Sequence, residues 1–182
     1  MDYVLAPFTI VIDTREQAGY DFRGFKADAD KRYAPLVIPI EIGTLQTGDY
    51  SLKGYEDRIA IERKSKADCF STFSQGRDRF ERELERMRSM DFAAVVVEAT
   101  LGSCQTDPPE HTKFSFKSFY RSYIRWMVRY RVPFIFCPTK NEAERATMRM
   151  LQGFWLDEQE RNKLAGKEAA IHAPPQEPQR AV

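Results

Sequence analysis

Histidine and cysteine are scarce in this sequence, with 2 and 3 residues among 182. His111 falls in an expected loop and His172 near the C-terminal end, and neither is placed as a metal ligand or catalytic base. Cys69, Cys104 and Cys137 are odd in number and lack the spacing of zinc ligands. The pattern favours reduced thiols in the core of a cytosolic protein.

Long apolar runs and an excess of charge of either sign are also lacking. No window approaches the ~18 apolar residues of a membrane-spanning helix, and the start, MDYVLAPFTI, has no basic region followed by a long apolar run. We therefore expect a soluble intracellular chain without a membrane partner, in the cytoplasm of a prokaryotic or phage-infected cell or in a eukaryotic nucleus. The 28 basic and 27 acidic residues give a net charge of +1, which neither requires nor excludes a polyanionic partner.

The length and the apolar content indicate one folded domain followed by a tail. An apolar content of 42% over 182 residues is enough to build a core. From Lys163 onward the sequence is rich in proline and lacks a hydrophobic period, so residues 163–182 are expected to be disordered. The domain would then span residues 1–162.

The stretch over residues 45–68, LQTGDYSLKGYEDRIAIERKSKAD, carries the chemistry around which the chain is expected to be organised. It is predicted to form a strand that starts at Gly48, a turn at Lys53-Gly54, a second strand over residues 58–64 and the start of a helix. The charged residues of this stretch therefore fall on two strands and a helix start.

Glu62 and Lys64 are expected on one face of the second strand and Arg63 on the other, because successive strand side chains point to opposite faces. Asp49 of the preceding strand would join Glu62. Two carboxylates that converge at about 4 Å repel by ~4 kcal/mol at an effective dielectric constant of about 20, so their convergence implies a cation between them. Carboxylate oxygens without nearby histidine or cysteine favour Mg²⁺ or Mn²⁺ over zinc. The stretch therefore predicts a metal-dependent nuclease.

The same residues carry a resemblance to a known family. Gly48-Asp49, the triplet Glu62-Arg63-Lys64 and Asp68 four residues later resemble the GD-x(n)-ERK-xxx-D signature of the XPF family of structure-specific DNA endonucleases. That family belongs to the restriction-endonuclease-like PD-(D/E)xK superfamily. The resemblance covers about residues 8 to 160. It implies an α/β fold with a restriction-endonuclease-like mixed central β-sheet flanked by helices, and an XPF-like nuclease domain over residues 1–162.

A buried strand expected over residues 8–13 ends in Asp13-Thr14-Arg15-Glu16, and the resemblance extends to this segment. The family carries a similar D-x-R-E beside its metal site, which implies functional roles for Asp13, Arg15 and Glu16. The alternative is that these polar residues only end a strand and begin a loop. A further strand is expected over residues 36–42. Because proline cannot donate a ladder hydrogen bond, Pro39 should place part of this strand at a sheet edge.

Two helices are expected after the central stretch. Ser65 would cap the first, and Asp68 near its N-terminus would either cap it as well or also support the metal site. The second would open at Gly76-Arg77, where the resemblance implies that Arg77 contacts a phosphate. Its remaining arginines and glutamates are expected to form a solvated face. Its apolar stripe consists of Phe80, Leu84 and Met87.

Alternating elements are expected over the rest of the chain. Residues 92–99 would form a strand buried on both faces, with Glu98 at the position of a family glutamate or merely at the strand's end. A loop over residues 100–112, a strand over 133–137 and a last helix from Asn141 to about Arg161 would follow.

The segment over residues 115–131 is expected to form a helix with an apolar and a basic stripe. The apolar stripe consists of Phe119, Tyr123, Trp126, Met127 and Tyr130, and the basic one of Lys117, Arg121, Arg125 and Arg129. Such a basic stripe either follows a phosphate backbone or keeps a surface helix solvated.

Hydrolysis of a DNA phosphodiester is the hypothesis that follows. Asp49 and Glu62 would bind Mg²⁺, with Mn²⁺ as a substitute, and Lys64 would orient a water or stabilise charge on the phosphorane. The remaining residues would complete the metal shell (Asp13, Glu16, Asp68) or hold phosphates (Arg15, Arg63, Arg77). Since alternation points Arg63 away from Glu62, either a local twist returns it or it pairs with a carboxylate across the sheet.

The resemblance implies branched or flap-like DNA as the substrate, in repair, recombination or replication. Family members usually carry a downstream tandem helix-hairpin-helix domain that grips DNA, which is missing from this sequence. A homodimer through the last helices, or a separate DNA-binding partner, would take its place. The alternatives are a catalytically silent DNA-binding scaffold with a nuclease fold, and a Holliday-junction resolvase on the same core.

Overall fold

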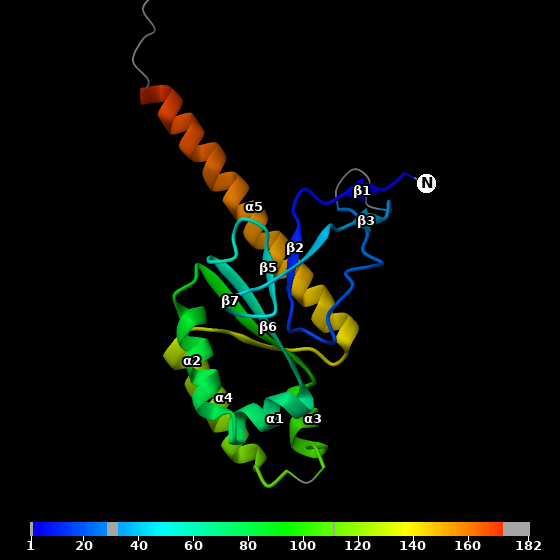
Figure 1. Cartoon of the computed structure of the whole chain (residues 1–182), viewed down its shortest axis with the longest axis vertical. Helices are drawn as coiled ribbons and strands as arrows, with labels where there is room; N and C mark the ends of the chain where they lie inside the picture. The colour runs from blue at the N-terminus through cyan, green and yellow to red at the C-terminus, as the bar shows by residue number, and fades with distance from the viewer. Residues whose placement is uncertain (1, 29–32, 111, 173–182) are drawn as a thin grey trace, which may run out of the picture.

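The computed structural model describes residues 2–28, 33–110 and 112–172. Its centre is a six-stranded mixed β-sheet in the order β4-β2-β5-β6-β7-β8 (Figure 1). The strands are β2 (Ile10–Asp13), β4 (Ile40–Gly43), β5 (Tyr50–Leu52), β6 (Ile59–Ser65), β7 (Phe92–Glu98) and β8 (Phe134–Phe136). Strand β5 runs antiparallel to both neighbours, and the other pairs are parallel. The predicted mixed central sheet is confirmed.

Helices cover both faces of the sheet (Figure 1). The helices α1 (Lys66–Ser74), α2 (Arg77–Arg88) and α4 (Phe116–Tyr130) pack on one face, and α5 (Lys140–His172) packs on the other. Strand β7 separates the two cores, with Ala94 and Val96 on the α5 side and Val95 and Val97 on the opposite side. The alternation of strand side chains thus buries β7 on both faces, as predicted.

The helices that border the expected site begin where the sequence places them. The Ser65 side chain accepts a hydrogen bond from the backbone N–H of Asp68 and so caps α1. Helix α2 follows directly after Gly76. The predicted apolar stripe of α2 is buried against the sheet and α4, and consists of Phe80, Leu84 and Met87.

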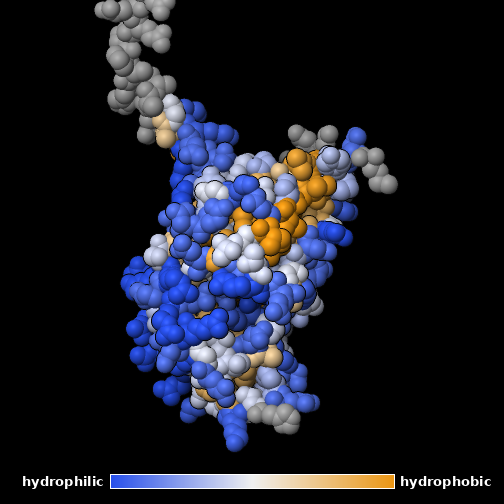
Figure 2. Space-filling view, in the orientation of Figure 1, coloured by the Kyte–Doolittle hydropathy of each residue, from blue (hydrophilic) through white to orange (hydrophobic). Residues whose placement is uncertain are grey.

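Pro39 divides the expected strand over residues 36–42 into two pieces. Strand β3 (Leu36–Val37) pairs with β1 (Val4–Leu5) in a separate two-stranded sheet, which was not predicted, and β4 forms an edge of the main sheet. Proline lacks a backbone N–H and therefore interrupts the ladder. Figure 2 shows that apolar side chains gather on the surface near β1 and β3.

The expected loop over residues 100–112 contains the short helix α3 (Leu101–Thr106), so that prediction was wrong over this part. Thr100 begins the helix, because its side-chain oxygen accepts the N–H of Ser103. Cys104 packs into the core from α3, and all three cysteines are buried and free, as predicted. His111 lies outside the described residues.

Helix α5 is longer than expected and continues beyond Arg161 to His172. The segment over residues 162–172 contains three alanines and two lysines, which favour a helix, and has no proline before Pro174 to end it. The prediction of disorder was therefore wrong for residues 163–172, while residues 173–182 lie outside the described ranges. No helix in the described part of the chain combines the length and apolar character needed to cross a membrane.

Candidate active-site cleft

An open cleft of about 840 Å³ lies where β2, β5 and β6 meet the start of α1 and one side of α2. It gathers eight of the residues predicted from the sequence: Asp13, Arg15, Glu16, Asp49, Glu62, Arg63, Lys64 and Asp68. The elements that carry them are separated by up to 55 positions in the sequence (68 − 13). The structure therefore brings the expected acidic, lysine and neighbouring arginine residues of these elements to one place.

Gly48 holds the chain close enough to β6 for Asp49 to reach the cleft. Its φ of +74° is in the left-handed region, and a Cβ there would lie 3.0 Å from the Cβ of Ala60 and 3.1 Å from the carbonyl oxygen of Ile61. The Asp49 backbone N–H donates to that Ile61 oxygen at 2.9 Å. The glycine in the Gly-Asp pair is therefore required by the close approach of the two strands.

Asp49 and Glu62 are partly desolvated acids that disfavour each other's ionised form. Burial raises the pKa of Asp49, and the Glu62 charge raises it further, although the Arg63 backbone N–H donates to Asp49 Oδ2 at 2.7 Å. Burial also raises the pKa of Glu62, against the opposing effect of Lys64. A cation between the two carboxylates would offset both their burial and their mutual repulsion, so such a pair favours a positive charge there.

Lys64 forms an ion pair with Glu62 on the cleft face of β6. Its Nζ lies 2.5 Å from Glu62 Oε1, and the side chains are only 16% and 8% exposed. Burial by itself lowers the pKa of Lys64, but the carboxylates of Glu62, Asp49 and Glu83 together more than offset this, so the pKa is raised and the lysine stays charged. The predicted placement of Glu62 and Lys64 on one face is confirmed.

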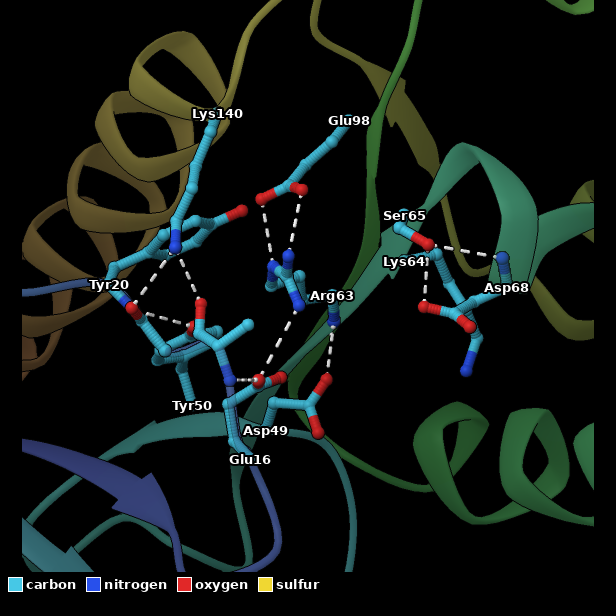
Figure 3. Close-up of polar contacts among 12 residues, drawn as sticks. Glu16, Tyr20, Asp49, Tyr50, Arg63, Lys64, Ser65, Asp68, Glu98 and Lys140 are labelled. Carbon is cyan, nitrogen blue, oxygen red and sulfur yellow. Dashed lines mark hydrogen bonds and ion pairs between the residues drawn. The ribbon is translucent and has the colours of Figure 1, made fainter.

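Arg63 points to the opposite side of β6, as Figure 3 shows. Its Nε and Nη2 donate to the two oxygens of Glu98 at 2.8 Å each, and its Nη1 lies 3.4 Å from Glu16 Oε1. Since Glu98 belongs to the neighbouring strand β7, Arg63 pairs with a carboxylate across the sheet, the second of the two expected alternatives. Its guanidinium is fully engaged there, and no local twist returns it toward Lys64.

Asp13 organises the rim of the cleft. It accepts the backbone N–H and the Nε of Arg15 at 2.8 and 2.7 Å, and the backbone N–H of Leu45 at 2.7 Å. These bonds and the Arg15 charge outweigh the effect of burial and lower the pKa of Asp13. Because both carboxylate oxygens are occupied, Asp13 positions Arg15, whose side chain is 68% exposed at the rim.

Asp68 lies at the wall of the cleft and takes part in the cap of α1. The Ser65 Oγ donates to its Oδ2 at 2.6 Å (Figure 3). Within the described residues no three or more His, Cys, Asp or Glu side chains converge as metal ligands. Asp49 and Glu62 are two carboxylates of the cleft whose pKa is raised by burial, which makes them the candidate donors for a divalent cation. One or two carboxylates, completed by water and substrate phosphate, are the donor set that Mg²⁺ commonly uses, so these residues fit it.

Four residues of α2 that the sequence reasoning treated as a solvated face also line the cleft: Arg79, Arg82, Glu83 and Arg86. Arg86 lies 3.8 Å from Glu83, whereas Arg79 and Arg82 have no ion pair with any described residue. At about 100° per residue, these four side chains fall on one side of the helix, which is the signal that could have found them. The arginines among them are exposed and Arg86 pairs with Glu83, so this side of α2 is solvated as predicted, and it also borders the cleft.

The predicted basic residues of α4 do not reach the cleft. Arg121 and Arg125 line a separate, smaller pocket together with Arg77 of α2. Lys117 lies exposed one turn before Arg121. Apolar residues on the opposite side of α4 bury the helix against the sheet, and the fully buried ones are Phe119, Trp126 and Tyr130.

Comparison with known proteins gives one family and two similar structures. The ERCC4 domain family model matches residues 12–150. XPF from Aeropyrum pernix is 14% identical with a TM-score of 0.57, over 96% of this chain and 69% of that one. XPF from Aeropyrum pernix in complex with DNA is 15% identical with a TM-score of 0.57, over 80% of this chain and 64% of that one. No curated protein sequence matches the chain. At these identities the structural similarity concerns the fold, and the predicted fold class is confirmed.

Proposed function

The chain belongs to the ERCC4 domain family and is a nuclease-type domain, and on that premise we propose that it is an active, metal-dependent DNA endonuclease. The observation that carries the proposal is the open cleft in which two partly desolvated carboxylates, Asp49 and Glu62, lie beside the half-buried ammonium of Lys64. A scaffold with no catalytic role gains nothing from this arrangement, because the two acids disfavour each other's charge.

Asp49 and Glu62 would hold Mg²⁺, for which Mn²⁺ would substitute. When bound, such an ion supplies a Lewis acid that polarises a phosphate oxygen and lowers the pKa of a nearby water. The carboxylates supply the negative charge that holds it, and the Arg63 N–H fixes the orientation of Asp49. Asp68 and Glu16, at the edges of the same cleft, would contribute through water.

Lys64 would act directly on the reacting phosphate. Hydrolysis forms one bond from a water oxygen to phosphorus and breaks one bond from phosphorus to a sugar oxygen. Negative charge builds on the phosphate during this exchange, and the Lys64 ammonium on the cleft wall would stabilise that charge or orient the water. Glu62 keeps Lys64 in place, since the ion pair fixes a flexible side chain.

DNA is the substrate that the walls of the cleft favour. Arg79 and Arg82 bring two cations into the cleft that pair with no acid among the residues the structure describes, and Arg15 adds a third at the rim. Guanidinium groups bind phosphate oxygens well because their geometry allows two parallel hydrogen bonds. XPF from Aeropyrum pernix was solved in complex with DNA, which supports the same class of ligand here. We propose branched or flap-like DNA as the preferred form.

Two alternative functions and a dimeric assembly are further proposals for this domain. A Holliday-junction resolvase would use the same cleft and would differ in substrate ranking. A silent DNA-binding scaffold would bind the same DNA without cutting it. Dimerisation through the last helix, or with a DNA-binding partner, would be tested by measuring the mass in solution with and without DNA.

The decisive experiment is a cleavage assay on labelled flap, fork, four-way junction and linear duplex DNA, each with Mg²⁺, with Mn²⁺ and with EDTA. We expect cutting with either metal and none with EDTA. The Asp49→Asn variant should fold normally and cut at least a hundredfold more slowly, because losing a metal ligand removes several kcal/mol of transition-state stabilisation at about 1.4 kcal/mol per tenfold.

A matched control is Asp57→Asn, which changes an exposed aspartate outside the cleft. It should cut at the parental rate. A folded Asp49→Asn protein with parental activity would refute the metal-ligand assignment. Binding without cutting under every condition would favour the scaffold.

A further inference from the structure

A second pocket, of about 250 Å³, lies between α2 and α4 outside the cleft. It is lined by three arginines and two serines: Arg77, Ser118, Arg121, Ser122 and Arg125. All five side chains carry hydrogen-bond donors, and the lining contains no carboxylate. The composition is that of a site for an anion rather than for an apolar ligand.

Arg77 is held in place at the base of this pocket. Its Nη1 donates to the Ser122 Oγ at 2.9 Å, and its Nε lies 3.0 Å from Glu81 Oε1. The guanidinium also lies 4.8 Å from the ring centre of Trp126. Glu81 is shared with Trp126, Tyr130 and Arg129, so it does not neutralise the pocket by itself. Arg77 is thus a preorganised donor with its orientation fixed by three contacts.

Arg121 and Arg125 add two positive charges that no acid in the described part of the chain compensates. Neither side chain forms an ion pair there, and both are exposed. They are four residues apart on α4, which places them on the same side of the helix one turn apart. Like charges at this spacing destabilise a helix slightly. An anion bound between these two side chains and Arg77 would reduce the repulsion among the three positive charges.

The pocket and the cleft lie on opposite sides of α2. At about 100° per residue, the cleft residues Arg79, Arg82 and Arg86 point roughly 140–200° away from Arg77. Figure 2 shows hydrophilic side chains over the surface of the region that contains α2. A third hollow shares five charged residues with the cleft and reaches Gly76 before the N-terminus of α2; the shared residues are Glu62, Lys64, Asp68, Arg79 and Glu83. Gly76 of this hollow directly precedes Arg77 of the pocket in the chain, so the two hollows meet the start of α2 at neighbouring residues.

We propose that the pocket formed by Arg77, Arg121 and Arg125 binds a backbone phosphate of the same DNA whose scissile phosphate lies in the cleft. The inference rests on the proposed function and adds a second contact point outside the reaction centre. Helix α2 is about 10–12 Å wide, so the two phosphates would lie about three nucleotides apart or more at ~3.4 Å per nucleotide of a duplex strand. The hydroxyls of Ser118 and Ser122 would complete the donor set around the phosphate. The pocket would then fix how far DNA extends past the cleavage point.

The test measures DNA binding by fluorescence anisotropy over a series of salt concentrations. Every protein carries Asp49→Asn, so that the DNA stays intact. The double change Arg121→Gln with Arg125→Gln should weaken binding to a labelled forked duplex of about 24 base pairs roughly tenfold, as expected for lost charge-assisted contacts. The slope of log affinity against log salt should become shallower by about 0.9, the value for one phosphate contact.

The matched control is Arg88→Gln with Arg131→Gln, which removes the same charge from the ends of α2 and α4 outside the pocket. It should leave the salt slope unchanged, and thermal unfolding should confirm that all proteins are folded. Parental affinity and slope for the pocket variant, or equal losses in the control, would overturn the proposal while leaving the nuclease assignment in place. An absence of DNA binding by the Asp49→Asn protein itself would overturn both.

Discussion

The two faces of β6 differ in how their charges are paired, although only three consecutive residues are involved. On one face Arg63 is 11% exposed and makes two 2.8 Å hydrogen bonds to Glu98, with Glu16 as a further partner. On the other face, Glu62 has Lys64 as a partner, but Asp49 has no ion pair within the described residues. Both faces contribute residues to the lining of the cleft, but the charges of the first face are compensated by their ion pairs, whereas Asp49 borders the cleft without one in the described part of the chain.

This difference separates a stabilising site from a reactive one. A buried charge whose hydrogen bonds are all made has little left to offer a ligand, and removing one partner is costly. Acids with a raised pKa and an open side gain from a cation or a substrate group. The alternating geometry of a single strand thus supplies both the support and the chemistry of the cleft.

The largest effect should follow from breaking the compensated face. Arg63→Met would leave Glu98 and Glu16 buried without their cation, and we expect the free energy of unfolding to fall by about 3–5 kcal/mol. Urea unfolding followed by circular dichroism would measure it. The double change Arg63→Met with Glu98→Leu should recover a large part, because both charges are then gone. A loss below about 1 kcal/mol in the single variant would contradict the stabilising role.

On the open face, Lys64→Met should mainly affect the reaction. We expect single-turnover DNA cleavage to slow by about a hundredfold or more, equivalent to ~3 kcal/mol, since the charge that builds on the phosphate loses its ammonium. Lys66→Met is the matched control two residues later, because Lys66 pairs with the exposed Asp107 outside the cleft. Equal losses from both substitutions would show that the effect is not specific to the cleft.

A smaller effect on stability should come from Asp49→Asn, measured without divalent cations. The pKa of Asp49 is raised in the folded protein, so the folded state binds the proton more tightly than the unfolded state does. This stabilisation is fully present below the unfolded pKa of about 4 and is lost as the pH rises through the folded pKa. Asparagine does not titrate and still accepts the Arg63 N–H, so the variant should become the more stable protein as the pH rises.

We expect its advantage to reach on the order of 1–2 kcal/mol near pH 8 and to shrink toward pH 5. Urea unfolding at several pH values would measure it. An advantage that is independent of pH would contradict the raised pKa. Adding Mg²⁺ should then stabilise the parent and leave the variant unchanged, because only the parent keeps both carboxylates.

The local rules of the sequence predicted much of the fold and of the cleft. The alternation of a strand placed Glu62 with Lys64 and Arg63 opposite them. The cap at Ser65 and the apolar stripe of α2 located the two neighbouring helices. Two predictions failed where the sequence carries little sign of a helix. The short helix α3 has one capping threonine at its start, and α5 continues for eleven residues past Arg161 (172 − 161).

The sequence by itself determined which side chains share a face, because the periods of strands and helices depend only on neighbouring residues. It could therefore group Arg79, Arg82 and Arg86 on one side of α2, but it did not say what that side meets. The tertiary structure decided this: the packing of Phe80 and Leu84 against the sheet and α4 fixes the rotation of α2. That rotation turns one side of α2 toward Glu62 and the other toward α4, since contacts between distant segments depend on how the whole core packs.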